Sequence, residues 1–112
     1  MKRSTKSLIG AAMCTFLTFG AVANEKLILP GHISNDVEFC ETYAKAVKRI
    51  AVARDGGQSV ESMVKVIRGV GVEPDAEKMM IRTTALIYNQ VYSTPNELKR
   101  AAFSECTMSM LK

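Results

Sequence analysis

Two cysteines, Cys40 and Cys106, constrain the fold of this chain more than any other feature, because they lie 66 residues apart. An even pair of cysteines in a short exported chain predicts a disulfide, and two cysteines allow only one pairing within a chain. Closing a loop of this length is worth about 4 kcal/mol in the chain-entropy model, which is comparable to the net stability of a small domain. Two free buried thiols and a bridge between two chains are the alternatives.

The disulfide prediction requires that the chain is exported, and the N-terminus carries the three parts of an export signal. Three cations within the first seven residues precede an uncharged apolar run from Leu8 to Phe19, and Ala21-Val22-Ala23 matches an A-x-A cleavage site. We therefore predict a signal peptide over residues 1–23, cleavage after Ala23 and a periplasmic location. A retained anchor is the alternative, but the apolar run is shorter than the roughly 20 residues that span a bilayer. Acylation of Cys14 is another alternative, although the residues before it lack the usual lipoprotein pattern.

Removal of the signal changes what the charge of the chain suggests. The full chain has a net charge of +4 at pH 7, but three of its 15 Lys and Arg residues fall within the first 23 positions. The rest of the chain keeps 12 basic against 11 acidic residues and is nearly neutral. Such a balance gives no support for a nucleic-acid partner. We expect no nucleic-acid binding, and no membrane insertion after cleavage.

An extended arm and a first helix are predicted to follow the signal. Residues 24–34 have no helical period, and Pro30-Gly31 ends their short apolar run, so they form the arm. The first helix is expected to start at Asn35, as the N-cap of a capping box with Glu38, and to end at an Asp-Gly-Gly sequence. Its buried stripe recurs every three or four residues: Cys40, Tyr43, Ala44, Val47, Ile50, Ala51 and Arg54.

Two further segments have the period of helices. After the cap residue Ser59, apolar residues are spaced as in a helix up to the glycines at 69–71, although β-branched residues at 64–67 leave a strand as the alternative. The next helix opens at Pro74, which suits a first turn, and is expected to stop just before Thr94. Its predicted buried stripe consists of Ala76, Met80, Thr84, Ile87 and Val91.

The last helix has the clearest start signal, because Thr94-Pro95-Asn96-Glu97 combines a capping box with a proline at the first helical position. Cys106 falls near the end of this helix, and Cys40 near the start of the first. Those two points lie at the same end of an up-down-up-down bundle with short loops. We predict an all-α fold, a small four-helix up-down bundle over residues 35–112 with the first helix tied to the fourth by a disulfide.

Catalytic and metal-binding patterns are missing from the sequence. His32 is the single histidine, and with Asp36 it could supply half of a metal site, but no second histidine exists and both cysteines of the pair are expected to be oxidised. A serine nucleophile would have to recruit His32 from the arm. No G-x-S-x-G, phosphate-cradling loop or H-E-x-x-H sequence is present. We expect no enzymatic activity, no metal and no cofactor.

A candidate binding surface is predicted instead, from residue types that are common in adaptable interfaces. Tyr88 and Tyr92 are spaced i, i+4 on the third predicted helix, and Met79 precedes them. Arg54 continues an apolar stripe, so it is either a buried, paired structural arginine or a member of the same surface. Ordinary filling of the core is the alternative for the tyrosines and methionines.

Five short motifs are spread over most of the chain after the signal: Cys40, Tyr43-Ala44, Ala53-Arg54-Asp55-Gly56, Val91-Tyr92-x-x-Pro95 and Cys106. They resemble those of small, functionally unassigned exported all-helical single-disulfide proteins of Gram-negative bacteria. The resemblance implies a helical periplasmic protein and carries no catalytic residue. In size and disulfide design the chain is also similar to periplasmic acid-stress chaperones. We expect a non-enzymatic protein that binds another periplasmic protein, with a stress holdase as the alternative and a small hydrolase third.

Overall fold

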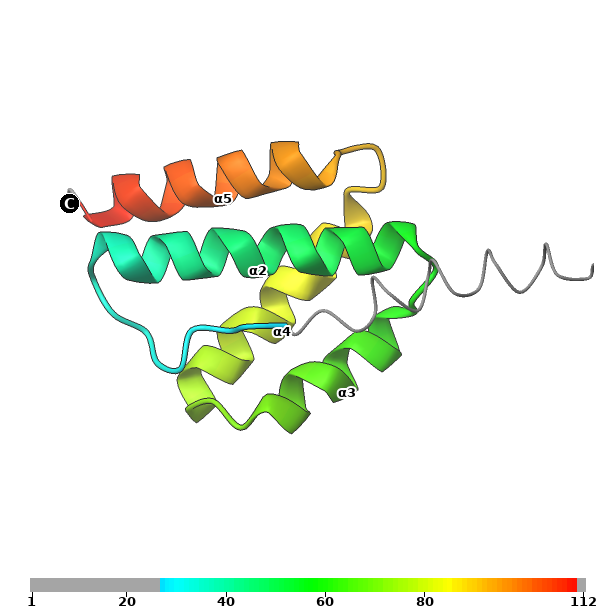
Figure 1. Ribbon diagram of the computed structural model, residues 1–112, viewed down its shortest axis with the longest axis horizontal. Helices are drawn as coiled ribbons and strands as arrows, with labels where there is room; N and C mark the ends of the chain where they lie inside the picture. Colours follow the sequence, from blue (N-terminus) through cyan, green and yellow to red (C-terminus); the bar gives the residue numbers. More distant parts are fainter. Residues whose placement is uncertain (1–26, 111–112) are drawn as a thin grey trace, which may run out of the picture.

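The computed structural model describes residues 27–110, and the signal predicted over residues 1–23 lies outside them. Four helices are present, α2 (Val37–Asp55), α3 (Val60–Val70), α4 (Pro74–Asn89) and α5 (Pro95–Met110), and no strand occurs within the described range. Successive helices run in alternating directions (Figure 1). The predicted all-α four-helix bundle is confirmed.

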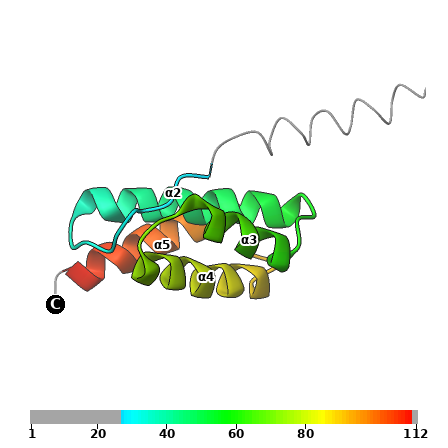
Figure 2. The same cartoon turned by 90° about the horizontal axis from the view of Figure 1, so that it is seen from below.

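Helix α2 is the centre of the bundle, because it packs against each of the other three helices. Helix α5 lies antiparallel along α2, and α4 crosses α2 obliquely and packs on α3 (Figure 1). Seen from below, α2 lies over α4, with α3 in front and α5 behind (Figure 2). Within residues 27–110, none of the helices combines the length and the apolar character needed to cross a membrane.

Helix α2 begins two residues after Asn35, because Asp36 rather than Asn35 is its N-cap. The backbone of Asp36 is extended, with φ −144°, and its Oδ1 accepts a hydrogen bond from the Phe39 amide at 2.7 Å. The Ser34 hydroxyl donates to the other carboxylate oxygen at 2.9 Å. The Phe39 bond first, and the Ser34 bond second, lower the pKa of Asp36. A charged carboxylate at this end of a helix also interacts favourably with the helix dipole, which an asparagine cannot match.

Glycines end α2 and α3, with one departure from the prediction. Gly57 (φ +99°) and Gly71 (φ +84°) adopt the left-handed conformation that suits a residue following a helix. Gly69, which was expected to break the second helix, lies inside α3. Ser59 caps α3 as predicted, and residues 64–67 are helical, so the strand alternative is wrong.

The core forms where the apolar stripes of the helices meet. Tyr43 and Arg54 of the predicted first stripe are half-buried, and the other members are buried. Val91, placed in the third stripe, is 58% exposed because α4 ends before it. The buried hydrophobic residues of the helices are Cys40, Ala44, Ala46, Val47, Ile50, Ala51, Met63, Ile67, Ala76, Met80, Ile87, Leu98 and Ala102.

The arm and the disulfide both hold the end of the bundle where α2 begins (Figure 1). Leu29 of the arm is buried, and the Glu73 amide donates to the Gly31 carbonyl at 2.9 Å, so the arm is held against the start of α4. The disulfide between Cys40 and Cys106 is present, with the two Cα atoms 5.6 Å apart, and it joins α2 to α5 as predicted.

Candidate functional site

The four residues predicted as a binding surface do not lie together. Met79 is half-buried in the first half of α4, whereas Tyr88 lies near the end of that helix. Helix α4 stops at Asn89, so Tyr92 falls in the following turn and the predicted i, i+4 pair on one helical face is wrong. Arg54, at the end of α2, lies at the same end of the molecule as Tyr88. Its guanidinium binds backbone carbonyls at the end of α4 and in the turn that follows.

The Arg54 guanidinium is inserted into the turn between α4 and α5. Its Nη1 donates to the carbonyls of Ile87 and Gln90, both at 2.9 Å, and its Nη2 donates to the carbonyl of Ser93 at 2.8 Å. Nε donates to Oδ1 of Asp55 at 2.9 Å, and Nη2 lies 2.8 Å from the same oxygen. The side chain is only 7% exposed, so every guanidinium nitrogen has a partner and little of its surface is left for another molecule.

These contacts explain why α4 ends where it does. A helix leaves its last four carbonyls without partners, and a cation near this end is also favoured by the helix dipole. Arg54 supplies donors to the Ile87 and Gln90 carbonyls, and the Gln90 amide turns back to the Ile87 carbonyl at 3.1 Å. The chain then turns again through a hydrogen bond of 3.1 Å from the Ser93 amide to the Gln90 carbonyl. The spacing of apolar residues predicts a helix up to residue 93, but these hydrogen bonds end it at Asn89.

Tyr88, near the end of α4, contacts both the core and the segment before α3. Its hydroxyl donates to the Gln58 carbonyl, just before α3, at 2.8 Å, and its ring packs against the core. Burial raises the pKa of the Tyr88 phenol, and the positive charge of Arg54 offsets part of that rise. Tyr88 therefore has a structural role, as the core-filling alternative predicted.

The far side of the turn is held by the capping box of α5. The Thr94 amide donates to Oε1 of Glu97 at 2.8 Å, and the Glu97 amide donates to the Thr94 hydroxyl at 3.1 Å, as predicted. The hydrogen bond from the Thr94 amide, and then that from its side chain, lower the pKa of Glu97. The turn is thus held by Arg54 before residue 94 and by the capping box after it.

Three apolar side chains lie exposed on and beside this fixed turn, and we call them the turn surface. Tyr92 is 97% exposed, Leu86 is 59% exposed and Val91 is 58% exposed. Sequence analysis found Tyr92 by its residue type. It did not find Leu86, which the helical spacing placed off the buried stripe without distinguishing it from other exposed residues.

Other chemistry is sparse in the part of the chain that the structure describes. His32 is exposed on the arm, and within residues 27–110 no three His, Cys, Asp or Glu side chains come together in a way that could hold a metal ion. Neither a protein-family model, nor a curated protein, nor a solved structure matches the chain. The class that the geometry defines is a small all-α bundle with its first and last helices joined by a disulfide.

Proposed function

We propose that this protein is an exported, non-enzymatic protein that binds another protein through the turn surface of Leu86, Val91 and Tyr92. The observation that carries the proposal is the 97% exposure of Tyr92 on a turn whose backbone is held by the buried side chain of Arg54. Tyrosine is among the residues that dominate the energetics of protein interfaces. A large aromatic ring fully in solvent gains most from burial against a partner.

The rigidity of the turn supports this role. Ordering a loop at an interface opposes binding, and a loop that is already ordered avoids that cost. Here three carbonyls around Tyr92 accept hydrogen bonds from one arginine, and the next residues form a closed capping box. The Arg54 charge is balanced locally by Asp55.

The proposed location is the periplasm. The N-terminal pattern of cations, apolar run and A-x-A site supports export. The disulfide between Cys40 and Cys106 supports an oxidising compartment, since disulfides persist there and are rare in reducing ones.

A capture experiment with matched baits tests the proposal. The exported protein, purified with its disulfide intact, is immobilised beside Y92A and beside V66S/V70S. The control removes two apolar residues of α3 that are 42% and 43% exposed. We expect a periplasmic partner that the wild type and the control retain and Y92A loses, with affinity for the purified partner reduced about 30-fold in Y92A, the effect of a typical interface hot spot. A partner retained equally by Y92A would contradict the proposal.

A holdase chaperone is the second candidate, and a separate observation favours it. Within residues 27–110, ten large apolar side chains are between 36% and 97% exposed, and they are spread over the arm, all four helices and the turn. A holdase should suppress aggregation of an unfolded client, and each exposed apolar residue should contribute a little. Suppression that falls equally in Y92A and in V66S/V70S would favour the holdase, and no suppression at any pH would exclude it.

A further inference from the structure

The disulfide lies where α2 begins and α5 ends, and its two cysteines are buried unequally (Figure 1). Cys40 is fully buried, whereas Cys106 is half-buried and lines a hollow of about 550 Å³, which we call the terminal hollow. The apolar and sulfur-bearing residues that line it are Ile33, Phe39, Tyr43, Met79, Cys106 and Met110. A thiolate reduces a disulfide by attacking a sulfur that it can reach, so reduction is expected to begin at Cys106.

Met110, the last described residue of α5, covers the buried sulfur of the disulfide. Its Sδ lies 3.5 Å from Sγ of Cys40, and its side chain is half-buried at the terminal hollow. The rings of Phe39 and Tyr43, which stack with their centroids 6.2 Å apart, line the same hollow. A thioether suits this position, because it is apolar, polarisable and packs well beside aromatic rings.

Met110 also combines access to oxidants with a place beside the disulfide. Met63 and Met80 are 3% and 0% exposed, so peroxides cannot reach their sulfurs in the folded protein. Met108 is 62% exposed, but its Sδ lies 4.0 Å from the Ser104 hydroxyl, away from the disulfide. Oxidation of Met108 should therefore have no effect on the disulfide, whereas oxidation of Met110 changes a group in direct contact with it.

A methionine sulfoxide would not remain beside Cys40. Oxidation converts the apolar thioether into a polar group whose oxygen accepts hydrogen bonds, and a disulfide has no donor to offer. The Tyr43 hydroxyl is already paired with the Thr83 hydroxyl at 3.1 Å. Asn35 and Ser109 carry donors and line the terminal hollow. The oxidised side chain should turn towards these two residues and uncover the Cys40 sulfur.

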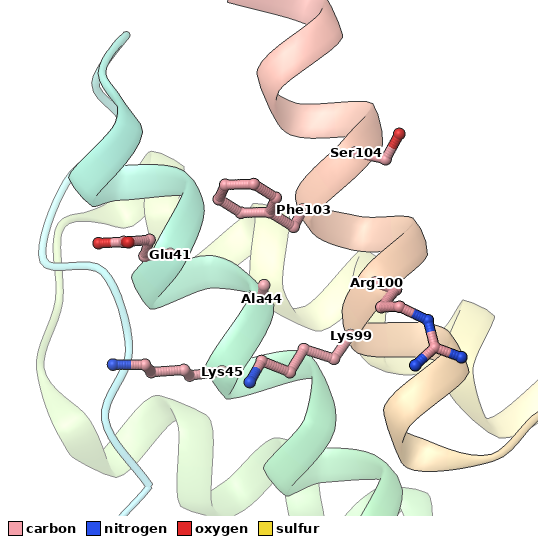
Figure 3. Close-up of a pocket in the computed structure, with 7 residues that line it drawn as sticks. All are labelled: Glu41, Ala44, Lys45, Lys99, Arg100, Phe103 and Ser104. Atoms are coloured by element: carbon pink, nitrogen blue, oxygen red, sulfur yellow. The ribbon is translucent and has the colours of Figure 1, made fainter.

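The end of α5 can change in this way while the rest of the helix stays in place. Leu98 and Ala102 of α5 are buried in the core. In Figure 3 the Phe103 ring projects from α5 towards α2, about two helical turns before Met110. The contacts that hold α5 on α2 therefore extend well beyond the terminal hollow.

We propose that Met110 is an oxidation site that controls access to the disulfide, with hydrogen peroxide as the oxidant. The sulfur lone pair attacks one peroxide oxygen, the O–O bond breaks, an S–O bond forms and water leaves. The sulfur loses two electrons, and the peroxide gains them. Enzymatic reduction of the sulfoxide restores the thioether, so the change is reversible. The site shares no residue with the turn surface, so the two proposals can fail separately.

Treatment of the disulfide-intact protein with hydrogen peroxide, followed by peptide mass spectrometry, tests the proposal. We expect sulfoxide at Met108 and then at Met110, while Met63 and Met80 react at least about tenfold more slowly. After the peroxide is removed, reduction of the disulfide by dithiothreitol, followed by thiol trapping, should be about fivefold faster than in the untreated protein. Absence of sulfoxide at Met110, or an unchanged rate of reduction, would overturn the proposal.

Matched variants show whether Met110 is responsible. M110L keeps an apolar side chain that peroxide does not oxidise, so treatment should leave its rate of reduction unchanged. M108L removes the exposed methionine of the same helix and should respond to peroxide as the wild type does. A faster reduction in treated M110L would overturn the proposal, because another residue would then be responsible. So would a general loss of helix in the circular dichroism of the oxidised wild type, because the whole domain would then have unfolded.

Discussion

The Arg54 side chain donates a hydrogen bond of 2.8 Å to the carbonyl of Ser93, which lies 39 residues further along the chain. The same guanidinium holds the Ile87 and Gln90 carbonyls, so the last turn of α2 determines where α4 ends. A charged group in this position is stable because each of its nitrogens has an oxygen partner and Asp55 balances its charge. One arginine thereby joins two helices and the turn that presents Tyr92.

Replacing Arg54 should destabilise the fold more than replacing any exposed arginine. In R54M the carbonyls of Ile87, Gln90 and Ser93 lose the hydrogen bonds from the guanidinium, and Asp55 loses its ion pair, so we expect the free energy of unfolding to fall by about 2–4 kcal/mol. R54K keeps the charge but cannot reach three carbonyls at once, so it should recover less than half of the loss. Urea unfolding followed by circular dichroism measures both. R82M, at an exposed position on α4, serves as the control and should change stability by less than about 0.5 kcal/mol.

The two tyrosines at this end of the molecule should separate folding from binding. Y88F removes a half-buried hydroxyl that donates to the Gln58 carbonyl, and we expect it to lower the free energy of unfolding by about 1 kcal/mol. Y92A removes a ring that is 97% exposed and should change stability by less than about 0.5 kcal/mol. Urea unfolding of both variants checks this. A large loss of stability in Y92A would mean that Tyr92 is part of the fold and not a surface for a partner.

Most of the features predicted correctly from the sequence are specified by residues close together in the chain. The Thr94–Glu97 capping box spans four residues, and the stripes of α2 and α4 repeat every three or four. The disulfide followed from counting cysteines once the signal was set aside. Local chemistry of this kind can be read without knowing the fold.

The errors occur where distant residues decide the local structure. The end of α4 at Asn89 depends on Arg54, whose partners lie between 33 and 39 residues away. The N-cap at Asp36 instead of Asn35 is the exception, because near neighbours, the Phe39 amide and the Ser34 hydroxyl, decide it.

Removing the disulfide should lower stability without changing the helices that form. C40A/C106A should reduce the free energy of unfolding by up to about 4 kcal/mol, because the unfolded chain regains the freedom of a 66-residue loop. Guanidinium unfolding of the variant, and of the wild type with and without dithiothreitol, measures the effect. Dithiothreitol should have no effect on C40A/C106A. A variant as stable as the oxidised wild type would show that the contacts between α2 and α5 alone hold the two helices together.

Acid should weaken the fold through two helix caps. The pKa values of Asp36 and Glu97 are lowered in the folded protein, chiefly by the Phe39 and Thr94 amides that donate to their carboxylates. A carboxyl group with a lowered folded-state pKa stabilises the fold fully above its unfolded pKa, about 3.9 for Asp and 4.3 for Glu, and this contribution is lost as the pH falls through the folded-state value. We therefore expect the thermal midpoint to decrease progressively below about pH 4.

D36N/E97Q should flatten this acid dependence, because neither replacement titrates. Asparagine can still cap a helix and glutamine can still complete a capping box, so the variant should fold normally at pH 7. Thermal unfolding followed by circular dichroism from pH 7 to pH 2 compares it with the wild type and with E105Q, which removes an exposed carboxylate of α5. E105Q should follow the wild-type curve. If D36N/E97Q loses stability as steeply as the wild type, other groups cause the acid sensitivity, and the two caps contribute little to it.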